Sequence, residues 1–284
     1  MSVAVPTTRD VPCVYAGCAG WNLPPAESHR FPKEGSHLAR YAARFAAGEI
    51  NSSFYRPHRR STYAKWAASV PATFRFSVKV PKTITHEHRL AGARKLLDTF
   101  IDEVTGLGDK LGCLLVQLPP SLEFNARVAK SFLSYLRKKY AGNVVLEPRH
   151  ATWFTAGAGK LLTASGVARV AADPALIPAA AEPGAWPGII YYRLHGSPRM
   201  YYSSYSDAYL KTLASRLNQL ARKAPVWCIF DKRLSALLMQ MHWTCCPSCA
   251  NTVSRSRSAT HARRSHFCPE ETPDRTLSGS RRRA

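Results

Sequence analysis

The sequence predicts an α/β protein of the (β/α)8 class, a TIM-type barrel in which eight parallel strands alternate with helices. Short apolar and β-branched runs alternate with longer stretches of helical periodicity from Val14 to Phe230, a rhythm typical of parallel strands joined by crossover helices. The eight runs fall within about 230 residues, which suits a closed barrel better than an open doubly wound sheet. Neither glycine-rich phosphate-binding motif of nucleotide-binding sheets follows the first run.

Each expected element has recognisable bounds, and all eight strands are expected to be parallel because helices separate them. The expected strands are Val14–Ala16, Glu49–Ser53, Phe74–Val80, Gly112–Leu118, Val144–Glu147, Ala168–Ala172, Ile189–Leu194 and Val226–Phe230. The expected helices are His37–Ala47, Thr62–Ser69, Ala93–Leu107, Ala126–Tyr140, Gly159–Ser165 and Ala208–Arg222.

Composition narrows the class of protein. The chain has 284 residues, is 45% hydrophobic and carries a formal net charge of +22, so a large core is expected together with either a polyanionic partner or simply a basic surface. No apolar run is long enough to cross a membrane, and the first thirty residues do not resemble a signal peptide. The eight cysteines are therefore expected as free thiols in a cytoplasmic protein. The oligomeric state is not indicated.

Polar residues cluster where the expected strands end. Because the carboxyl ends of barrel strands open on one face, we expect these side chains to gather in a shared site. Burying so many polar groups costs free energy unless they are paired or used. The predicted site residues are Asn51, Tyr55, Lys79, His86, Gln117, Glu147, Arg149, His150, Trp153, Asp173, Arg193, His195, Tyr205 and Asp231.

Four of these residues are candidate catalytic groups, namely Glu147, Asp173, Asp231 and His195, because carboxylates and imidazole perform acid–base chemistry or bind metals. The other ten are expected to contact substrate. Each candidate has a structural alternative. The two aspartates suit helix N-caps, His195 suits a core histidine, Lys79 suits a snorkelling surface lysine, and Glu147 suits an ion pair with a neighbouring arginine.

A divalent metal is the one cofactor that the pattern indicates. The four catalytic candidates end four consecutive strands, and adjacent strands lie about 4.8 Å apart, so one Mn²⁺, Mg²⁺ or Zn²⁺ ion is within reach of them all. The competing arrangement pairs Arg149 and Arg193 with the carboxylates and leaves no charge for a cation.

Several strings together resemble the YecE-like family, known as domain of unknown function 72, from about Val14 to Asp231. The resemblance implies a TIM-type barrel and brings no established activity. The first glycine motif departs from the family's usual Gly-Thr-Ser-Gly-Trp, with Cys18 and Ala19 in the middle places. The matching strings are Glu49–Tyr55, Thr85-His86, Gln117–Pro120, Glu147-x-Arg149-His150-x-x-Trp153 and Arg193–Gly196.

The chain after Asp231 no longer resembles the family, so we divide it into a barrel, 1–231, and a basic, low-complexity, disordered tail, 232–284. Back-translation of Met239–Cys246 with a one-base shift yields the family's Ala-Asn-Ala-Leu-Asp-Leu-Leu, which predicts a frameshift, in the gene or in its reading, and a lost last helix. The alternative is a zinc finger on Cys246, Cys249, His261 and His266, but the central gap is one residue short and the apolar core positions are missing.

Two function hypotheses follow. The first is an enzyme, a hydrolase or lyase, acting on a phosphorylated or other anionic small substrate at the strand carboxyl ends, where arginines bind the anion and flat rings stack on a sugar or base. The alternative is a non-catalytic protein that binds nucleic acid or an acidic metabolite with the same basic and aromatic residues at the strand carboxyl ends, which we call the mouth of the barrel.

Overall fold

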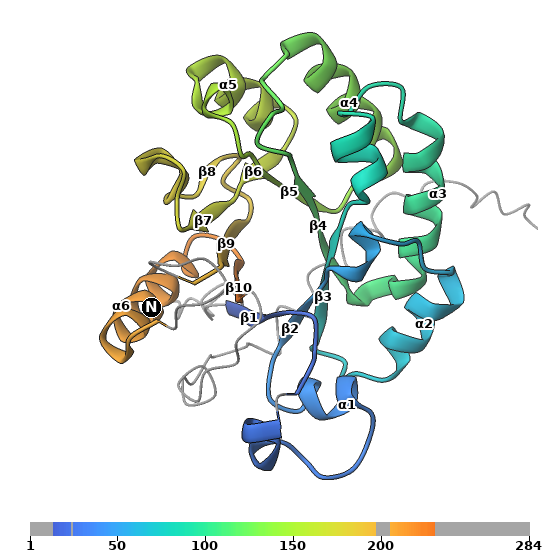
Figure 1. The fold of residues 1–284 in the computed structure, drawn as a ribbon, viewed down its shortest axis with the longest axis vertical. Coiled ribbons are helices and arrows are strands. Elements are labelled where there is room, and N and C mark those ends of the chain that lie inside the picture. The colour runs from blue at the N-terminus through green and yellow to red at the C-terminus, as the bar shows by residue number, and fades with distance from the viewer. Residues whose placement is uncertain (1–13, 24, 197–204, 231–284) are drawn as a thin grey trace, which may run out of the picture.

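The computed structural model describes residues 14–23, 25–196 and 205–230. Asp231 and the whole of 232–284 lie outside the described residues, and so do the predictions made for them: the catalytic role of Asp231, the frameshifted tail, the zinc-finger alternative and the lost last helix. The described residues form one curved sheet surrounded by helices (Figure 1).

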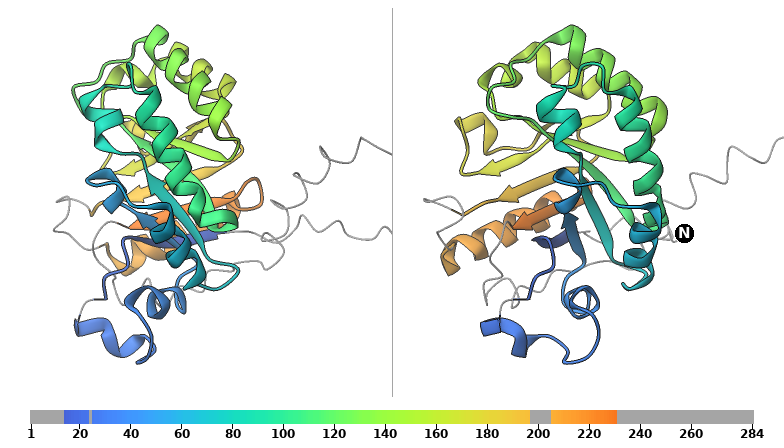
Figure 2. Two further views of the ribbon diagram at one scale, coloured as in Figure 1. Left: turned by 90° about the vertical axis from the view of Figure 1, so that its right-hand side faces the viewer. Right: turned by 45° about the vertical axis from the view of Figure 1, so that its right-hand side comes forward.

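The predicted barrel class is confirmed. The strands form one sheet in the order β7-β9-β10-β1-β2-β3-β4-β5-β6-β8, which curls into a nearly closed barrel (Figure 2). All pairs are parallel except β6 with β8. The strands are β1 Val14–Ala19, β2 Ala47–Ile50, β3 Arg75–Lys79, β4 Leu111–Gln117, β5 Asn143–Glu147, β6 Val167–Arg169, β7 Ala171–Asp173, β8 Gly184–Ala185, β9 Ile190–Leu194 and β10 Val226–Phe230.

The expected sixth strand, Ala168–Ala172, is corrected to two short strands on either side of Val170. The first, β6, pairs with β5, and the second, β7, pairs with β9. One apolar stretch thus bends to hydrogen-bond two neighbours and nearly closes the barrel. The antiparallel β8 is an addition that the sequence did not predict.

The helices lie outside the sheet, as the crossover pattern predicts (Figure 1). The two most amphipathic, α3 and α4, pack their apolar faces against the strands, and Asn125 caps α4 by accepting from the Val128 backbone N–H at 3.1 Å. The α-helices are α1 His37–Ala42, α2 Arg60–Ala68, α3 Arg94–Val104, α4 Ala126–Lys139, α5 Ala156–Ala164 and α6 Asp207–Leu220. Short helical turns are η1 Pro25–Arg30, η2 Ser52–Phe54, η3 Thr83–Glu87, η4 Thr105–Lys110, η5 Ala151–Phe154 and η6 Pro178–Ala180.

Aromatic rings fill the amino-terminal end of the barrel. Trp227 stacks on Tyr15 at 4.9 Å between centroids and on Tyr191 at 5.9 Å. All three are second residues of their strands. Side chains two positions apart on a strand share a face. Arg193 lies two positions after Tyr191 on β9, so it also faces the interior of the barrel. The barrel therefore has an apolar floor below a charged upper layer.

Gly17 lets β1 approach β2 closely. A Cβ at this position would lie 1.9 Å from the Ala47 carbonyl oxygen, which accepts a hydrogen bond from the Tyr41 hydroxyl at 2.9 Å. We predict that Gly17→Ala destabilises the fold by about 1–3 kcal/mol or more, because backbone must move. Gly159→Ala, in α5 with open space around it, is the matched control and should be neutral or stabilising. Urea unfolding distinguishes them, and equal effects would contradict the close-approach argument.

Candidate functional site

Arg193 on β9 is the centre of a buried ion network at the carboxyl ends of the strands. It is 2% exposed. Its Nε and Nη2 donate to the two carboxylate oxygens of Glu49 at 3.0 and 2.8 Å, and its Nη1 donates to Glu147 Oε2 at 2.7 Å. Gln117 Oε1 lies 3.5 Å from Nη1. One guanidinium thus joins β2, β5 and β9 across the barrel, by the bidentate geometry that favours arginine.

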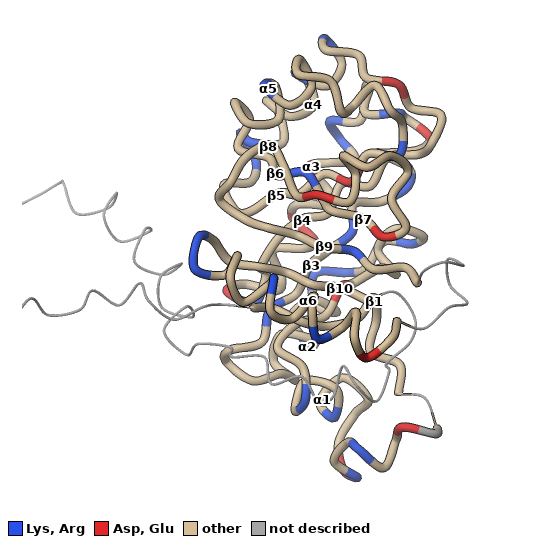
Figure 3. Tube along the Cα trace, turned by 90° about the vertical axis from the view of Figure 1, so that its left-hand side faces the viewer, with Lys and Arg blue, Asp and Glu red and all other residues tan. Residues whose placement is uncertain are grey.

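The network continues to Arg149, which is less buried. Arg149 Nε donates to Glu147 Oε1 at 2.7 Å, and its Nη2 lies 2.5 Å from the same oxygen. The Arg149 side chain is 19% exposed. Figure 3 shows basic positions along β3 and β9 as well as on the outer helices. Of the two arginines, Arg149 is therefore the one that solvent reaches.

His195 follows β9 and meets the same network. Its Nε2 lies 3.2 Å from Arg149 Nη2 and 3.6 Å from Glu147 Oε1. A guanidinium only donates, and 3.6 Å is too long for a hydrogen bond. The shorter contact therefore fits an unprotonated Nε2 that accepts from Arg149. Glu147, Arg149 and His195, which the sequence placed at neighbouring strand ends, are thus in contact in the structure.

The charge state of Glu147 follows from its partners. Burial opposes ionisation, but the Arg193 guanidinium, with Arg149 beside it, holds the pKa of Glu147 well below its usual value of 4.5. Burial likewise opposes the charge on Arg193, yet Glu49 and Glu147 raise its pKa well above the ordinary value. Glu147 and Arg193 are thus both ionised at neutral pH.

Lys79, at the end of β3, forms the second cationic part of the mouth. Its Nζ lies 3.9 Å from the centroid of the Phe54 ring, and the same ring meets His86 edge-on at 4.9 Å. Burial, and after it the charges of Lys79 and Arg149, lower the pKa of His86. The lowered pKa of His86 therefore indicates a positive electrostatic potential in this part of the mouth.

Asp173 forms a separate pair with Tyr205. The tyrosine hydroxyl donates to Asp173 Oδ2 at 2.6 Å and accepts from the Gly196 backbone N–H at 2.9 Å. Burial raises the pKa of Tyr205, and the bond to Asp173 raises it further. Tyr205, just before α6, thus contacts both Asp173 at the end of β7 and Gly196 after β9.

Asn51 and Tyr55 belong to the turn after β2 rather than to a strand, because β2 ends at Ile50. Tyr55 is 67% exposed. Asn51 Oδ1 is buried without a hydrogen-bond partner among the described residues. An unpaired buried acceptor costs free energy, which a donor on a ligand would recover. His150 accepts from the Thr152 backbone N–H at 3.4 Å and begins the η5 turn.

Two of the residues predicted to contact substrate make structural contacts instead. Trp153 is 1% exposed, and its Nε1 donates to the Leu122 carbonyl at 2.9 Å, so it packs in the core and offers no stacking face. Four of the five N–H donors of Arg193 are engaged by Glu49, Glu147 and Gln117, so its described contacts hold the network together.

Glu49 was missed as a site residue. It is completely buried, and besides both bonds from Arg193 it lies 3.1 Å from the Tyr191 hydroxyl. The signal was present in the sequence, since a carboxylate inside an apolar strand must be paired to be tolerated.

The metal prediction has no support in the part of the chain that the structure describes. No group of three or more His, Cys, Asp and Glu side chains there is arranged to hold a metal ion. Glu147 is shared by Arg193 and Arg149, which is the competing arrangement that the sequence left open.

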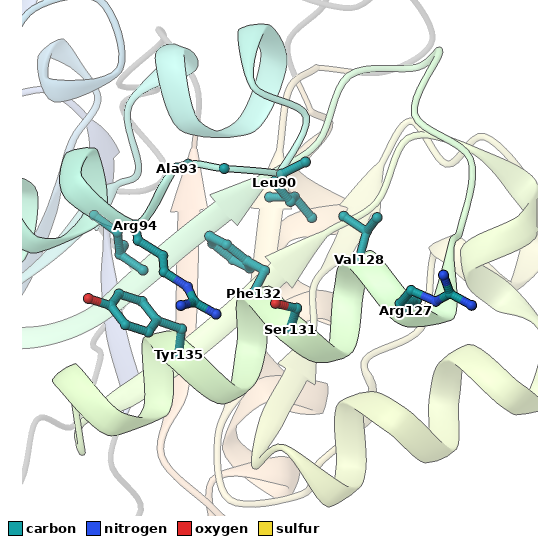
Figure 4. Close-up of a pocket in the computed structure, with 11 residues that line it drawn as sticks. Leu90, Ala93, Arg94, Arg127, Val128, Ser131, Phe132 and Tyr135 are labelled. Carbon is teal, nitrogen blue, oxygen red and sulfur yellow. The ribbon is translucent and has the colours of Figure 1, made fainter.

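Two small cavities lie away from the mouth, on the outer side of the barrel. One, of about 200 Å³, opens between the loop before α3 and helix α4, and Leu97, Phe132 and Tyr135 line it (Figure 4). The other, of about 230 Å³, continues past Leu90 to the edge of Trp153. Apart from Trp153, none of the predicted site residues lines either cavity.

The fold and the mouth define a TIM-like barrel protein with a buried ion network at the carboxyl ends of its strands. Residues 15–243 match the family described as "Protein of unknown function DUF72". The chain belongs to this family, as the sequence strings predicted.

Relatives agree with this assignment. The chain is similar to the UPF0759 protein YunF of Bacillus subtilis, with 29% identity over 154 residues that cover 50% of this chain and 52% of the relative. It is also similar to the UPF0759 protein YecE of Escherichia coli K12, with 27% identity over 148 residues and 51% of each chain. The chain thus spans about half the length of the curated relatives it matches.

Solved structures support the fold. A DUF72 family protein from Thermotoga maritima superposes with a TM-score of 0.63 at 22% identity, covering 80% of this chain and 97% of that chain. One from Enterococcus faecalis gives the same TM-score at 19% identity, covering 81% and 96%. Within the described residues, no helix is long and apolar enough to span a membrane.

Proposed function

We propose that the protein is an enzyme, a hydrolase or lyase, that acts on a small anionic substrate at the carboxyl ends of the barrel strands. The observation that carries the proposal is the position of Arg149, partly exposed between a buried carboxylate, Glu147, and an imidazole, His195. Arg193, which is itself paired with Glu49, holds Glu147 in position by a hydrogen bond. Such a preorganised array suits charge stabilisation in a reaction more than it suits stability alone.

The charges of the mouth favour an anion. Three cationic side chains, Arg149, Arg193 and Lys79, lie near Glu49 and Glu147 at this end of the barrel. Lys79 and Arg149 both depress the pKa of His86, so a phosphate or carboxylate placed near them would relieve repulsion between cations. The exposed ring of Tyr55 offers a face for a sugar or base. A sugar phosphate or nucleotide-like substrate meets these groups together.

In this proposal Arg149 and Lys79 bind the anion, and His195 transfers a proton beside it. The unpaired Asn51 oxygen accepts from a substrate hydroxyl. Glu147 orients Arg149, because its low pKa keeps it ionised and makes it a weak base. Asp173 and Asp231 remain predicted acid–base groups. Among the described residues, the buried thiols Cys113 and Cys228 form no disulfide, which is consistent with a reducing, cytoplasmic setting.

Titration with sugar phosphates and mononucleotides tests the anion site. We expect Arg149→Ala to weaken binding about 10–100-fold, since a charge-assisted hydrogen bond contributes about 1.5–3 kcal/mol. Arg127→Ala, on the exposed side of α4, removes the same charge away from the mouth and should leave binding unchanged.

The same titration separates the alternative, a non-catalytic protein that binds nucleic acid. Short single-stranded DNA is added at two salt concentrations. Binding only to DNA that weakens equally in Arg149→Ala and Arg127→Ala, and that modest salt abolishes, would locate the interaction in general surface charge and refute the mouth site.

A further inference from the structure

A serine and a histidine lie in contact in the loop between β2 and α2. Ser52 Oγ is 2.8 Å from His58 Nε2, the separation of a nucleophile from its general base. Both side chains are partly exposed. Ser52 begins the η2 turn directly after β2, so the pair lies on the face of the barrel where parallel strands end.

Two aromatic rings hold the imidazole in place. The His58 ring meets Trp66 edge-on at 5.0 Å and Tyr63 at 5.8 Å, both from α2. Burial, and then the charge of Arg56, lower the pKa of His58. The histidine is therefore neutral at physiological pH, the state in which it accepts the proton of a serine hydroxyl.

An apolar shelf lies beside the pair. Trp21, from the loop after β1, packs against Trp66 with 5.2 Å between ring centroids, and both rings are partly buried. The neighbouring Ser53 is different, since its hydroxyl is buried and lies 2.8 and 2.6 Å from the carbonyls of Ile50 and Lys79. Ser53 anchors the turn to β3 and leaves Ser52 as its accessible serine.

We propose that Ser52 and His58 are a nucleophile and general base that hydrolyse a carboxylic ester whose apolar part lies on Trp21 and Trp66. The inference rests on the proposed function only in placing an anionic group of that ester at Lys79, which Ser53 and Phe54 connect to the same turn. It narrows the reaction class from hydrolase or lyase to ester hydrolysis.

The reaction has two balanced halves. Ser52 Oγ bonds to the ester carbonyl carbon as its proton moves to His58 Nε2, and the carbon–oxygen bond to the alcohol then breaks as that proton passes to the leaving oxygen. Water next attacks the acyl-serine, giving a proton to His58, and the proton returns to Ser52 as the acid leaves. No oxidant, reductant or metal is required.

Diisopropyl fluorophosphate tests the pair, because it bonds to an activated serine with loss of fluoride. We expect mass spectrometry of the full chain to show one adduct, and peptide mapping to place it on Ser52. The labelling rate should fall at least about 100-fold in His58→Ala and rise with pH about a midpoint below 6.5, the ordinary pKa of histidine. Ser131→Ala, at an exposed serine on α4, is the matched control and should still label.

Mapping on the unaltered protein decides the question even if a variant fails to fold. No adduct, an adduct on another residue, or equal rates in folded His58→Ala and the unaltered chain would overturn the proposal. The reagent is uncharged, so labelling does not depend on the anion site. If the unaltered protein is labelled on Ser52 but binds no small anion, only the proposed function of the mouth is refuted. If it binds the anion but is not labelled on Ser52, only the serine–histidine pair is refuted.

Discussion

Arg193→Met is expected to destabilise the barrel by about 3–5 kcal/mol, the cost of leaving buried charge without its partner. Arg193 is 2% exposed, and both of its partner carboxylates, Glu49 and Glu147, are completely buried. The methionine fills similar space but cannot compensate either charge. Urea unfolding followed by circular dichroism measures the free energy of unfolding for both proteins.

An exposed arginine provides the control. Arg216 contacts Glu182 on the surface, with nearly half of its side chain exposed, and Arg216→Met should cost at most about 1 kcal/mol. Adding Glu49→Gln and Glu147→Gln to Arg193→Met should recover part of the loss, since neither completely buried carboxylate is then left charged without Arg193. Similar costs for the two single arginine variants would contradict the network's role.

The fold was predictable because apolar runs mark buried parallel strands almost continuously. The bounds of β4, β5, β9 and β10 differ from those expected by at most one residue. The stretch Ala168–Ala172 was predicted as one strand because hydrophobicity shows burial and not hydrogen-bond partners. Only the three-dimensional closure makes its two halves pair with different neighbours.

The sequence predicted the location of the candidate site better than the role of each residue in it. Glu147, Arg149 and His195 come together, since strand ends of a barrel share one face. The sequence did not show that Trp153 faces the core, because the turn after β5 sets its direction. It also did not show that Arg193 is paired with Glu49, because Glu49 lies 144 residues away in the chain.

The serine–histidine pair was invisible for a similar reason. Ser52 and His58 are six residues apart with no motif to connect them. The contact depends on the early end of β2 at Ile50 and on the turn that follows it. Local backbone geometry, which composition and periodicity do not specify, brings these two side chains into contact.

Glu147→Gln is expected to cost about 3–5 kcal/mol at neutral pH, and this cost should shrink in acid. The folded state holds the pKa of Glu147 well below its unfolded value of 4.5. A carboxyl with a lowered pKa stabilises the fold fully above the unfolded value, and this contribution is lost as pH falls through the folded one. The difference in unfolding free energy between the two proteins should therefore be constant above pH 4.5 and decrease below it.

Using the difference between the two proteins removes the titration of carboxyls that lie away from the network, whereas Glu49 shares Arg193 with Glu147 and stays coupled to it. Glu87→Gln, at an exposed pair with Lys82, is the control and should change stability by at most about 1 kcal/mol. A cost of Glu147→Gln that grows as pH falls would mean that burial outweighs Arg193 and Arg149. The carboxyl would then be protonated in the folded state, and Arg149 would lose the anion that positions it beside His195.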